Sequence, residues 1–442
     1  MAFNQKHATI HAMKQKHHYS MISLGCARSL VDSETMVADL NKVGFEIVPE
    51  GTSEQVTILN TCSFIQAAID ETERNISQLI DQKKEGSIQH VVVAGCYPSR
   101  FKKEILEEKY PDIDLWLTTK EEYTIQNELK KLVFKKKFTP KKPKPYTKLT
   151  PSHFAYLKIS EGCNNWCSFC TIPKIRGEHT SKPVQQIVDE AKLQIALGAK
   201  ELILIAEDTT CWGEDIYGKP SLDILVRALG ELDVDWIRLM YIFPPRVTQE
   251  LVTAIKETSN VIPYIDMPIQ HVNSDLLQRM NRRHDQAFLE KIMDMMVKEI
   301  PNLVLRTTFI LGFPGETEDH VNEIKTFIKK YPFAHIGCFT YSEERETRSA
   351  RFTDKVDPEI AKQRVDDVMK TQYDLLQTRN KSLIGTTLDC IIEGPREARS
   401  YREAPDVDGI IILDKETDLA IGSKCTVTIS AIDHYDLVGH LN

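Results

Sequence analysis

Strand-like and helical segments alternate between residues 155 and 339, and this alternation limits the fold more than any other feature of the chain. The expected strands are 155–160, 201–206, 236–241, 264–267, 305–311 and 335–339. The expected helices between them are 184–197, 221–232, 247–258, 288–300 and 320–330. Successive β-α units build a parallel sheet, and a complete barrel of this kind has about eight of them. Six strands therefore predict a partial (βα)6 barrel.

Two smaller regions flank this core. Upstream, strand-like runs at 19–25, 56–60 and 90–95 alternate with helical patterns at 33–43, 66–82 and 102–109, which predicts a small parallel α/β domain. Downstream, the apolar runs 386–393, 409–413 and 424–432 predict a small antiparallel β-barrel.

The regions between these patterns set the expected domain boundaries. Residues 1–18 are expected to be a disordered leader, with the first domain at 19–135 and the core at 149–379. The β-domain is expected at 380–442. Between the first two domains, 136–148 lies in a stretch rich in Lys and Pro, which indicates an exposed linker. A basic RNA-binding patch is the alternative for this stretch.

Composition excludes some classes of protein. The net charge of −8 opposes a general nucleic-acid binder, whose binding surface is usually basic. The chain contains no apolar run long enough to span a membrane, and its first residues lack the apolar segment of a signal peptide. We therefore expect a cytoplasmic protein, in which the ten cysteines stay reduced.

Three of these cysteines form a short cluster, C-x3-C-x2-C, directly after the first strand of the core: Cys163, Cys167 and Cys170. A zinc site normally needs four protein ligands, and His179 is a poorly spaced fourth. A redox dithiol explains Cys167 and Cys170 but leaves Cys163 without a role. An iron–sulfur cluster with one iron lacking a protein ligand explains all three thiols.

Three further cysteines occupy matching positions in the first domain. Cys26, Cys62 and Cys96 each follow an expected parallel strand, so that they meet at one edge of the sheet. Three separately buried cysteines are the alternative. The matched placement favours a second cluster.

The C-x3-C-x2-C motif at the end of the first strand of a partial barrel resembles that of the radical S-adenosylmethionine enzymes. The resemblance implies that Cys163, Cys167 and Cys170 hold a 4Fe–4S cluster whose open iron binds S-adenosylmethionine. Reduction then cleaves this cofactor to a 5′-deoxyadenosyl radical. In this barrel family the active site lies at the carboxyl ends of the strands.

The whole chain, from about residue 19 to 441, resembles the methylthiotransferases of that superfamily. LGCARSLVDSE, NTCSFIQAAIDE, AGCYPSR and TTFILGFPGETE have counterparts there, and GCFTYS and APDVDG resemble the RimO group. The resemblance implies an auxiliary 4Fe–4S cluster on Cys26, Cys62 and Cys96, and a TRAM-like β-domain. Arg28, Ser29 and Glu207 depart from the usual residues of the RimO group, which puts local contacts in doubt.

This resemblance implies an enzyme that adds a methylthio group to the β-carbon of an aspartate in small-subunit ribosomal protein twelve. Its cofactors are then two 4Fe–4S clusters and S-adenosylmethionine, with an external electron donor and sulfur source, in a monomer without a membrane partner. Residues 380–442 hold six Lys or Arg and eleven Asp or Glu, and this acidic domain suits a basic ribosomal protein.

Four residues near the cysteine motif have weaker predicted roles. Phe169 is expected near the adenine or in the core, and Arg176 at the cofactor carboxylate or on the surface. Glu207 and Asp208, after the second strand of the core, are expected to contact the cofactor or to cap a helix.

Two other functions stay open at this stage. A tRNA-adenosine methylthiotransferase is supported by the Lys-rich linker and opposed by the acidic β-domain. A zinc-stabilised RNA-binding scaffold without catalysis is the more remote alternative.

Overall fold

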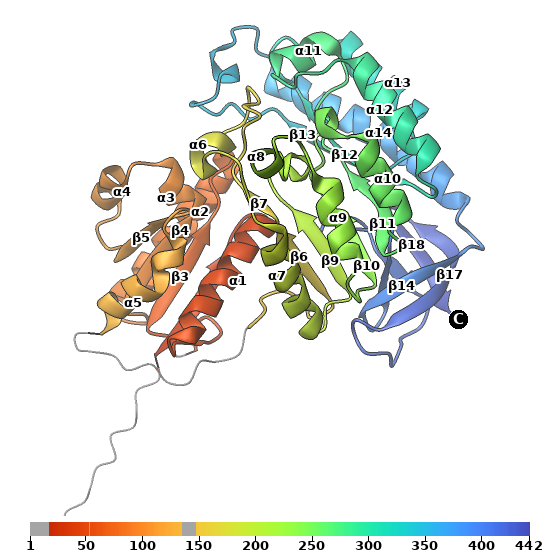
Figure 1. Ribbon diagram of the computed structural model, residues 1–442. Coiled ribbons are helices and arrows are strands. Elements are labelled where there is room, and N and C mark those ends of the chain that lie inside the picture. The colour runs from red at the N-terminus through yellow and green to blue at the C-terminus, as the bar shows by residue number, and fades with distance from the viewer. Residues whose placement is uncertain (1–16, 53, 135–146) are drawn as a thin grey trace, which may run out of the picture. The chain divides into compact units, whose positions relative to one another are not determined.

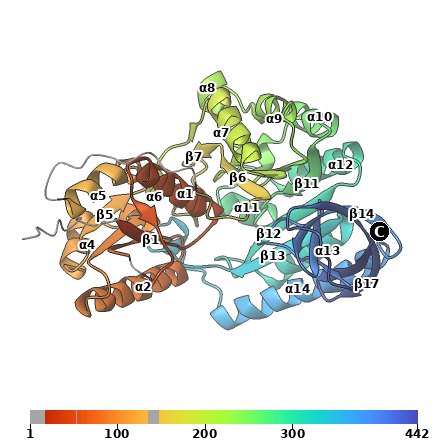
Figure 2. The same ribbon diagram turned by 90° about the horizontal axis from the view of Figure 1, so that it is seen from below.

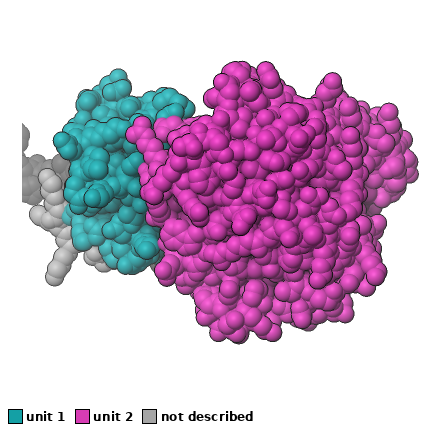
Figure 3. All heavy atoms as spheres, turned by 90° about the horizontal axis from the view of Figure 1, so that it is seen from above, with its two compact units in different colours: residues 1–63, 68–147 teal, residues 64–67, 148–442 magenta. Residues whose placement is uncertain are grey.

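The computed structural model describes residues 17–52, 54–134 and 147–442 (Figure 1). The expected leader and linker therefore lie almost wholly outside the described residues. The chain divides into two compact units, residues 1–63 with 68–147 and residues 64–67 with 148–442 (Figure 3). No helix among the described residues is both long and apolar enough to cross a membrane.

The first unit is built on a five-stranded parallel sheet with the order β2-β1-β3-β4-β5. Its strands are β1 (His18–Ser23), β2 (Glu46–Ile47), β3 (Val56–Thr61), β4 (His90–Gly95) and β5 (Leu115–Thr118). Its helices are α1 (Ala27–Lys42), α2 (Gln66–Lys84), α3 (Cys96–Arg100), α4 (Lys103–Lys109), η1 (Glu122–Thr124) and α5 (Ile125–Val133). The expected parallel α/β fold is confirmed.

Both faces of this sheet are buried. Leu59, Val91 and Val93 pack with apolar residues of α2, which covers one face. Ile58 and Val92 are fully buried on the other face, because successive side chains of a strand point in opposite directions. The central strands consequently read as continuous apolar runs, which is typical of parallel sheets.

The second unit contains the expected partial barrel. Six parallel strands pair in the order β13-β12-β11-β10-β9-β6. They are β6 (Phe154–Lys158), β9 (Glu201–Ile205), β10 (Trp236–Leu239), β11 (Val261–Asp266), β12 (Val304–Leu311) and β13 (Phe333–Thr340). The prediction of a six-stranded parallel core is confirmed.

Helices cover the outer face of this sheet (Figure 2). The main ones are α7 (Val184–Ala196), α9 (Leu222–Gly230), α10 (Gln249–Glu257), α12 (Gln286–Glu299), α13 (Glu318–Lys330) and α14 (Pro358–Lys381). Shorter elements connect them: β7 (Ser160–Glu161), β8 (Thr180–Ser181), α6 (Ile172–Arg176), η2 (Thr209–Cys211), α8 (Glu214–Tyr217), η3 (Pro244–Arg246), α11 (Ser274–Arg279) and η4 (Ser349–Arg351). Helix and sheet side chains share one large apolar core.

The chain ends in a closed five-stranded barrel, drawn blue below β10 and β11 in Figure 1. Its strands are β14 (Thr387–Gly394), β15 (Glu397–Ser400), β16 (Ile411–Leu413), β17 (Lys424–Asp433) and β18 (Asp436–Leu441). The predicted β-barrel is confirmed. Four of its pairings are antiparallel, whereas β16 and β18 run parallel.

A loop of the β-barrel, residues 401–409, fastens it to the six-stranded sheet. Asp408 accepts a hydrogen bond from the hydroxyl of Tyr264 on β11 at 2.6 Å and pairs with Arg306 on β12 at 3.2 Å. Arg306 in turn pairs with the fully buried Asp266 at 2.8 Å. The loop carries the APDVDG motif, so this motif is a structural link between the two domains.

A second buried network lies beside it, at the amino ends of the strands. Glu201, the first residue of β9, pairs with Arg238 of β10 and with Arg399 of β15, each at 2.6 Å. Arg399 also pairs with Glu393, which accepts from His153 at 2.6 Å. These charges are buried yet each has an opposite partner, which is the condition under which buried charges are tolerated.

Candidate functional site

The three clustered cysteines lie on one loop at the carboxyl end of β6, between β7 and α6. All three are free thiols and are partly buried. Two backbone hydrogen bonds fold the loop, from the amide of Cys163 to the carbonyl of Gly177 at 3.1 Å and from Cys170 to Cys167 at 3.0 Å. The loop therefore lies at the end of the sheet where barrels of this type hold their active sites.

The backbone of this loop is strained at two positions. Gly162 has φ +72°, and a Cβ there would lie 2.2 Å from the carbonyl oxygen of Glu178, so that only glycine fits. Trp166 has φ 51° although it is not glycine, and its side chain is 52% exposed. Non-glycine residues in this region are uncommon and concentrate at functional sites.

The chemistry of this loop fits an iron–sulfur cluster. Burial raises the pKa of the Cys163 thiol to about 12, with Asp208 and Cys167 adding to the effect, so that a thiolate there needs positive charge beside it. On the same loop, Nη1 of Arg282 lies 3.7 Å from the sulfur of Cys167, and the buried Nε–H of Arg282 has no acceptor among the described residues. Thiolates hold iron–sulfur clusters, whose inorganic sulfides accept hydrogen bonds.

No three Cys, His, Asp or Glu side chains in the described ranges are grouped as around a single metal ion. The ligand roles of the six cysteines therefore rest on the sequence motif and the family. His179 does not reach toward the thiols as a fourth ligand: its Nε2 lies 3.0 Å from the Ser181 hydroxyl and 3.7 Å from Asp215.

Arg176 and Glu207 are the buried members of a chain of alternating charges beside the cysteine loop. The Arg176 side chain is 2% exposed and donates to Glu161 at 2.7 Å, and its Nε lies 3.5 Å from Glu207. Glu161 also pairs with Lys158 at 2.7 Å. The surface alternative for Arg176 is therefore wrong, because the residue is buried between two carboxylates.

Both carboxylate oxygens of Asp208 are engaged, one in capping η2 and the other in holding the cysteine loop. One of its oxygens caps η2, accepting from the amide of Cys211 at 3.1 Å and the hydroxyl of Thr210 at 2.6 Å. The other accepts from the Asn165 amide at 2.7 Å and from Arg246 at 2.9 Å. Of the two expected roles, these contacts support the helix cap.

Phe169 is half-buried and packs against Leu276, Met280 and Phe313. The core alternative for this residue therefore has direct support, and a role near the adenine stays a prediction.

In the first unit, the other three cysteines follow neighbouring strands as expected. Cys26 is the N-cap of α1, Cys62 comes directly after β3, and Cys96 is the first residue of α3 directly after β4. The register pairs Thr61 with Gly95, the residues just before Cys62 and Cys96. The sequence positions of these two cysteines therefore match across the sheet.

Two glycines allow these segments to approach one another. Gly25 has φ +97°, and a Cβ there would lie 3.3 Å from the sulfur of Cys62. Gly95 has φ +98°, and a Cβ there would lie 2.2 Å from the side-chain oxygen of Asn60. The structure thus brings the loop of Cys26 against Cys62, as the strand-end placement predicted.

The departures at Arg28 and Ser29 lie in the first turn of α1. Ser29 is 1% exposed, and its backbone carbonyl accepts from the side chain of Asn60 at 2.8 Å. This contact uses the main chain, so the identity of residue 29 leaves it intact. Asn60 also donates to Ser33 and so ties α1 to β3.

The sequence analysis missed the residues that position the cysteine loop from a distance. Asn165 and Arg246 bind Asp208, and Asn281 donates to the carbonyls of Asn165 and Trp166 at 3.2 and 2.8 Å. The only signal for Asn281 is its place in a family motif, YIDMPIQHVNSDLLQRMNR.

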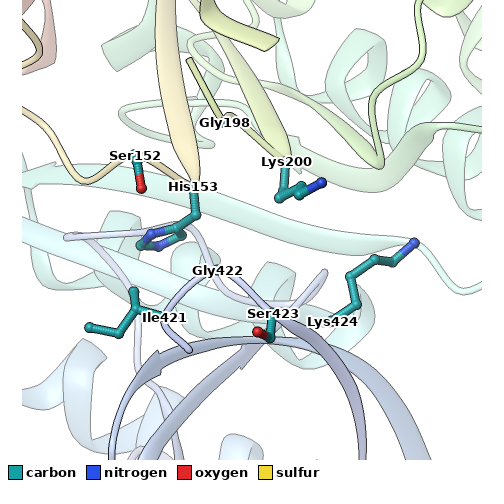
Figure 4. A pocket seen from close by; sticks show the side chains of 8 residues that line it. All are labelled: Ser152, His153, Gly198, Lys200, Ile421, Gly422, Ser423 and Lys424. Carbon is teal, nitrogen blue, oxygen red and sulfur yellow. The ribbon is translucent and has the colours of Figure 1, made fainter. Parts of the chain in front are cut away.

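A hollow of about 420 Å³ lies at the opposite, amino end of the sheet, lined by Ser152, His153, Gly198, Lys200, Ile421, Gly422, Ser423 and Lys424 (Figure 4). Gly422 must be glycine, since a Cβ there would lie 2.7 Å from that of His153. This hollow is separate from the cysteine loop.

The chain matches three families in succession. Residues 18–118 match the uncharacterized protein family UPF0004, residues 157–328 match the radical SAM superfamily, and residues 384–441 match the TRAM domain.

Among solved structures, the fold is similar to that of the radical S-adenosylmethionine methyltransferase TsrM from Kitasatospora setae. The TM-score is 0.57 at 12% identity, over 92% of this chain and 80% of that one. At this identity the similarity supports the fold alone.

Two relatives are similar over nearly their whole length. A ribosomal protein uS12 methylthiotransferase RimO of Dictyoglomus thermophilum is 38% identical over 95% of this chain and 99% of its own. Another, of Lachnoclostridium phytofermentans, is 36% identical over 95% and 98%. With this identity and coverage, and with radical SAM and TRAM regions in the same order, the chain belongs to the RimO family of ribosomal protein uS12 methylthiotransferases.

Proposed function

We propose that this protein adds a methylthio group to the β-carbon of an aspartate in ribosomal protein uS12. The observation that carries the proposal is two cysteine triplets in a chain of the RimO family, one on the single loop that follows β6 and β7 and the other after three neighbouring parallel strands. Removing hydrogen from an unactivated carbon is beyond any side-chain acid or base at neutral pH, which explains the need for a radical cofactor.

In this proposal each triplet holds one 4Fe–4S cluster. Cys163, Cys167 and Cys170 hold the cluster that binds S-adenosylmethionine, and Cys26, Cys62 and Cys96 hold the auxiliary cluster. When bound, the first group supplies the radical and the second the sulfur. The residues of the chain hold the ligand loops in place and keep their surroundings largely free of water.

Glu207 and Arg176 are our candidates for orienting the cofactor. Both side chains are nearly buried, 3% and 2% exposed, next to the cysteine loop. A carboxylate and a guanidinium held this rigidly suit the amino and carboxylate groups of an amino-acid moiety. Asp208 acts one step further away, by holding Asn165 on the loop.

The acidic β-domain is the proposed docking surface for the basic ribosomal protein. We further propose that the enzyme works as a monomer in the cytoplasm and takes electrons and replacement sulfur from external donors.

Two measurements in cells with and without this gene test the main proposal. The intact mass of uS12 is expected to fall by one methylthio group when the gene is removed, while the modified nucleosides of tRNA stay the same. An unchanged uS12 mass and the loss of a hypermodified adenosine would instead establish the tRNA-modifying alternative.

Metal analysis separates the enzyme from a zinc-stabilised scaffold. Purified without oxygen, the enzyme is expected to contain about eight irons, as two 4Fe–4S clusters. One zinc per chain and no visible absorption would rule out a radical enzyme.

A further inference from the structure

Residues 280–282 directly follow α11, and all three contact the cysteine loop. The carbonyl of Met280 accepts from the amide of Ser168 at 2.9 Å. Asn281 donates from its side chain to two carbonyls of the loop, and Nη1 of Arg282 lies 3.7 Å from the sulfur of Cys167. This segment is therefore the immediate support of the loop.

The backbone of this segment is fixed in an unusual conformation. Asn281 has φ 59° and Arg283 has φ 57°, so that two residues in the left-handed region flank Arg282. Such conformations are unfavourable for residues other than glycine and persist where the surroundings enforce them, commonly at functional sites. They fix the direction in which the Arg282 side chain leaves the main chain.

Arg282 is a buried cation without a carboxylate partner in the part of the chain that the structure describes. The residue is 5% exposed. Its guanidinium lies 4.4 Å from the centre of the Phe243 ring, and Nη2 donates to the carbonyl of Pro268 at 2.5 Å. Its Nε–H is buried and has no acceptor among the residues that the structure describes. Buried charges are normally paired, so this guanidinium lacks an anion that the loaded site would supply.

We infer that Arg282 is a positioning residue that tunes the cluster on Cys163, Cys167 and Cys170, by donating a hydrogen bond to the Cys167 sulfur and placing its charge beside the cluster. Reduction adds negative charge, and a fixed cation with hydrogen bonds to sulfur stabilises the reduced form. Arg282 therefore raises the reduction potential of this cluster. The inference rests on the proposed function, which places a cluster on this loop.

The test is a redox titration of the whole enzyme, followed by electron paramagnetic resonance. The relevant cluster is the one whose signal changes when S-adenosylmethionine is added. In Arg282→Gln we expect its potential to fall by at least about 59 mV, which corresponds to a tenfold change in a one-electron equilibrium. Arg282→Lys keeps the charge but loses the planar fork, and its potential is expected between the other two.

Arg279→Gln is the matched control. Arg279 lies one turn earlier on α11 and also stacks on an aromatic ring, that of Phe352, but it pairs with Asp354 at 2.7 Å. We expect this variant to keep its iron and its potential.

Each outcome separates the inference from the proposed function. Wild-type enzyme without iron would overturn the proposed function itself. Normal iron and an unchanged potential in Arg282→Gln would overturn the inference alone. If Arg282→Gln loses iron, the Arg282→Lys variant becomes the test. A lowered reduction potential of its cluster supports the inference, and an unchanged potential overturns the inference. Loss of iron in both variants, with Arg279→Gln intact, would show that Arg282 only holds the loop.

Discussion

The two ends of the six-stranded sheet in the second unit both bury paired charges, but they differ at one arginine. At the amino end, Glu201 binds two arginines, and Asp408 binds Arg306 and the hydroxyl of Tyr264. At the carboxyl end, Arg282 faces a cysteine sulfur and an aromatic ring without a carboxylate among the described residues.

We connect this difference with the separate roles of the two ends in stability and in catalysis. The fully paired networks of Glu201 and Asp408 fix one arrangement of the β-barrel on the sheet, although buried ion pairs contribute little net stability by themselves. A buried charge without an opposite partner, flanked by strained backbone as at Arg282, is typical of a functional site. In barrels of this type the carboxyl end carries the reaction and the opposite end carries stability. Arg282 follows that division, although its neighbours at the carboxyl end, Asp208 and Arg176, are paired.

The largest expected effect comes from Cys163→Ala at the carboxyl end. The variant is expected to lose about four of its irons and all methylthio transfer, because one 4Fe–4S cluster loses a ligand. Iron analysis and the mass of uS12 after reaction measure both effects. Cys338→Ala, in which a partly buried cysteine of β13 is removed, is the control and should keep its iron.

Cys26→Ala tests whether the second triplet holds its own cluster. The variant is expected to lose about four irons, those of the auxiliary cluster, and still to cleave S-adenosylmethionine. If either cysteine variant loses all its iron, the two triplets do not hold separate clusters.

At the amino end, Asp408→Ala is expected to cost stability rather than chemistry. Arg306, His335 and Tyr264 would lose their shared partner, and breaking a buried charge pair costs about 3–5 kcal/mol. The shift of the urea midpoint under anaerobic conditions measures the loss, and the folded variant should keep its iron.

The neighbouring Asp406 is the control, because its carboxylate is exposed and, within the described ranges, accepts a hydrogen bond from Tyr156 alone, at 3.3 Å. Asp406→Ala should cost about 1 kcal/mol, mainly because its φ of 64° is unfavourable for alanine. Equal urea midpoints in the two variants would contradict a stabilising role of the Asp408 network.

The same network gives a pH dependence. Burial alone would raise the pKa of Asp408, but His335 and Arg306 hold that pKa below its usual value. Because the folded-state pKa is lowered, this stabilisation is present above about pH 4 and is lost as the pH falls further. In Asp408→Ala the acid-induced loss of stability should be smaller than in the wild type.

Gly162→Ala tests the strained cysteine loop. The variant combines a left-handed backbone with a Cβ only 2.2 Å from the Glu178 carbonyl, and we expect a loss of about 2–3 kcal/mol together with less bound iron. Gly218→Ala is matched in φ at +75° but has open space around it. It should cost about 1 kcal/mol and no iron. A similar loss of iron in both variants would contradict a specific fit at Gly162.

The smallest effect is expected at the exposed edge of the amino end. Lys424 pairs with Asp235 at 2.8 Å, beside the hollow of Figure 4, and its side chain is 57% exposed. Solvent screens such a pair, so Lys424→Ala should cost less than about 1 kcal/mol in urea unfolding. A loss as large as that of Asp408→Ala would show that exposed pairs also hold the β-barrel in place.

The fold was predictable where the apolar pattern is strong. The six strands of the core and the three longer strands of the first unit are rich in apolar residues, as is typical of parallel sheets. The helix α14 was missed because few of its residues are buried, so that its apolar pattern is weak. Its start carried a usable signal, Asp357 as the cap followed by Pro358. The strand β2 is only two residues long and has no pattern to detect.

The sequence by itself determined the family and the candidate ligands, because three thiols within eight residues and three thiols after expected strands are the residue type that holds iron–sulfur clusters. Only the tertiary structure showed which distant residues hold the cysteine loop and the β-barrel in place. Arg282 and Cys167 are 115 positions apart, and Asp408 and Arg306 are 102. Local sequence cannot show such contacts, since they depend on how distant segments pack around one sheet.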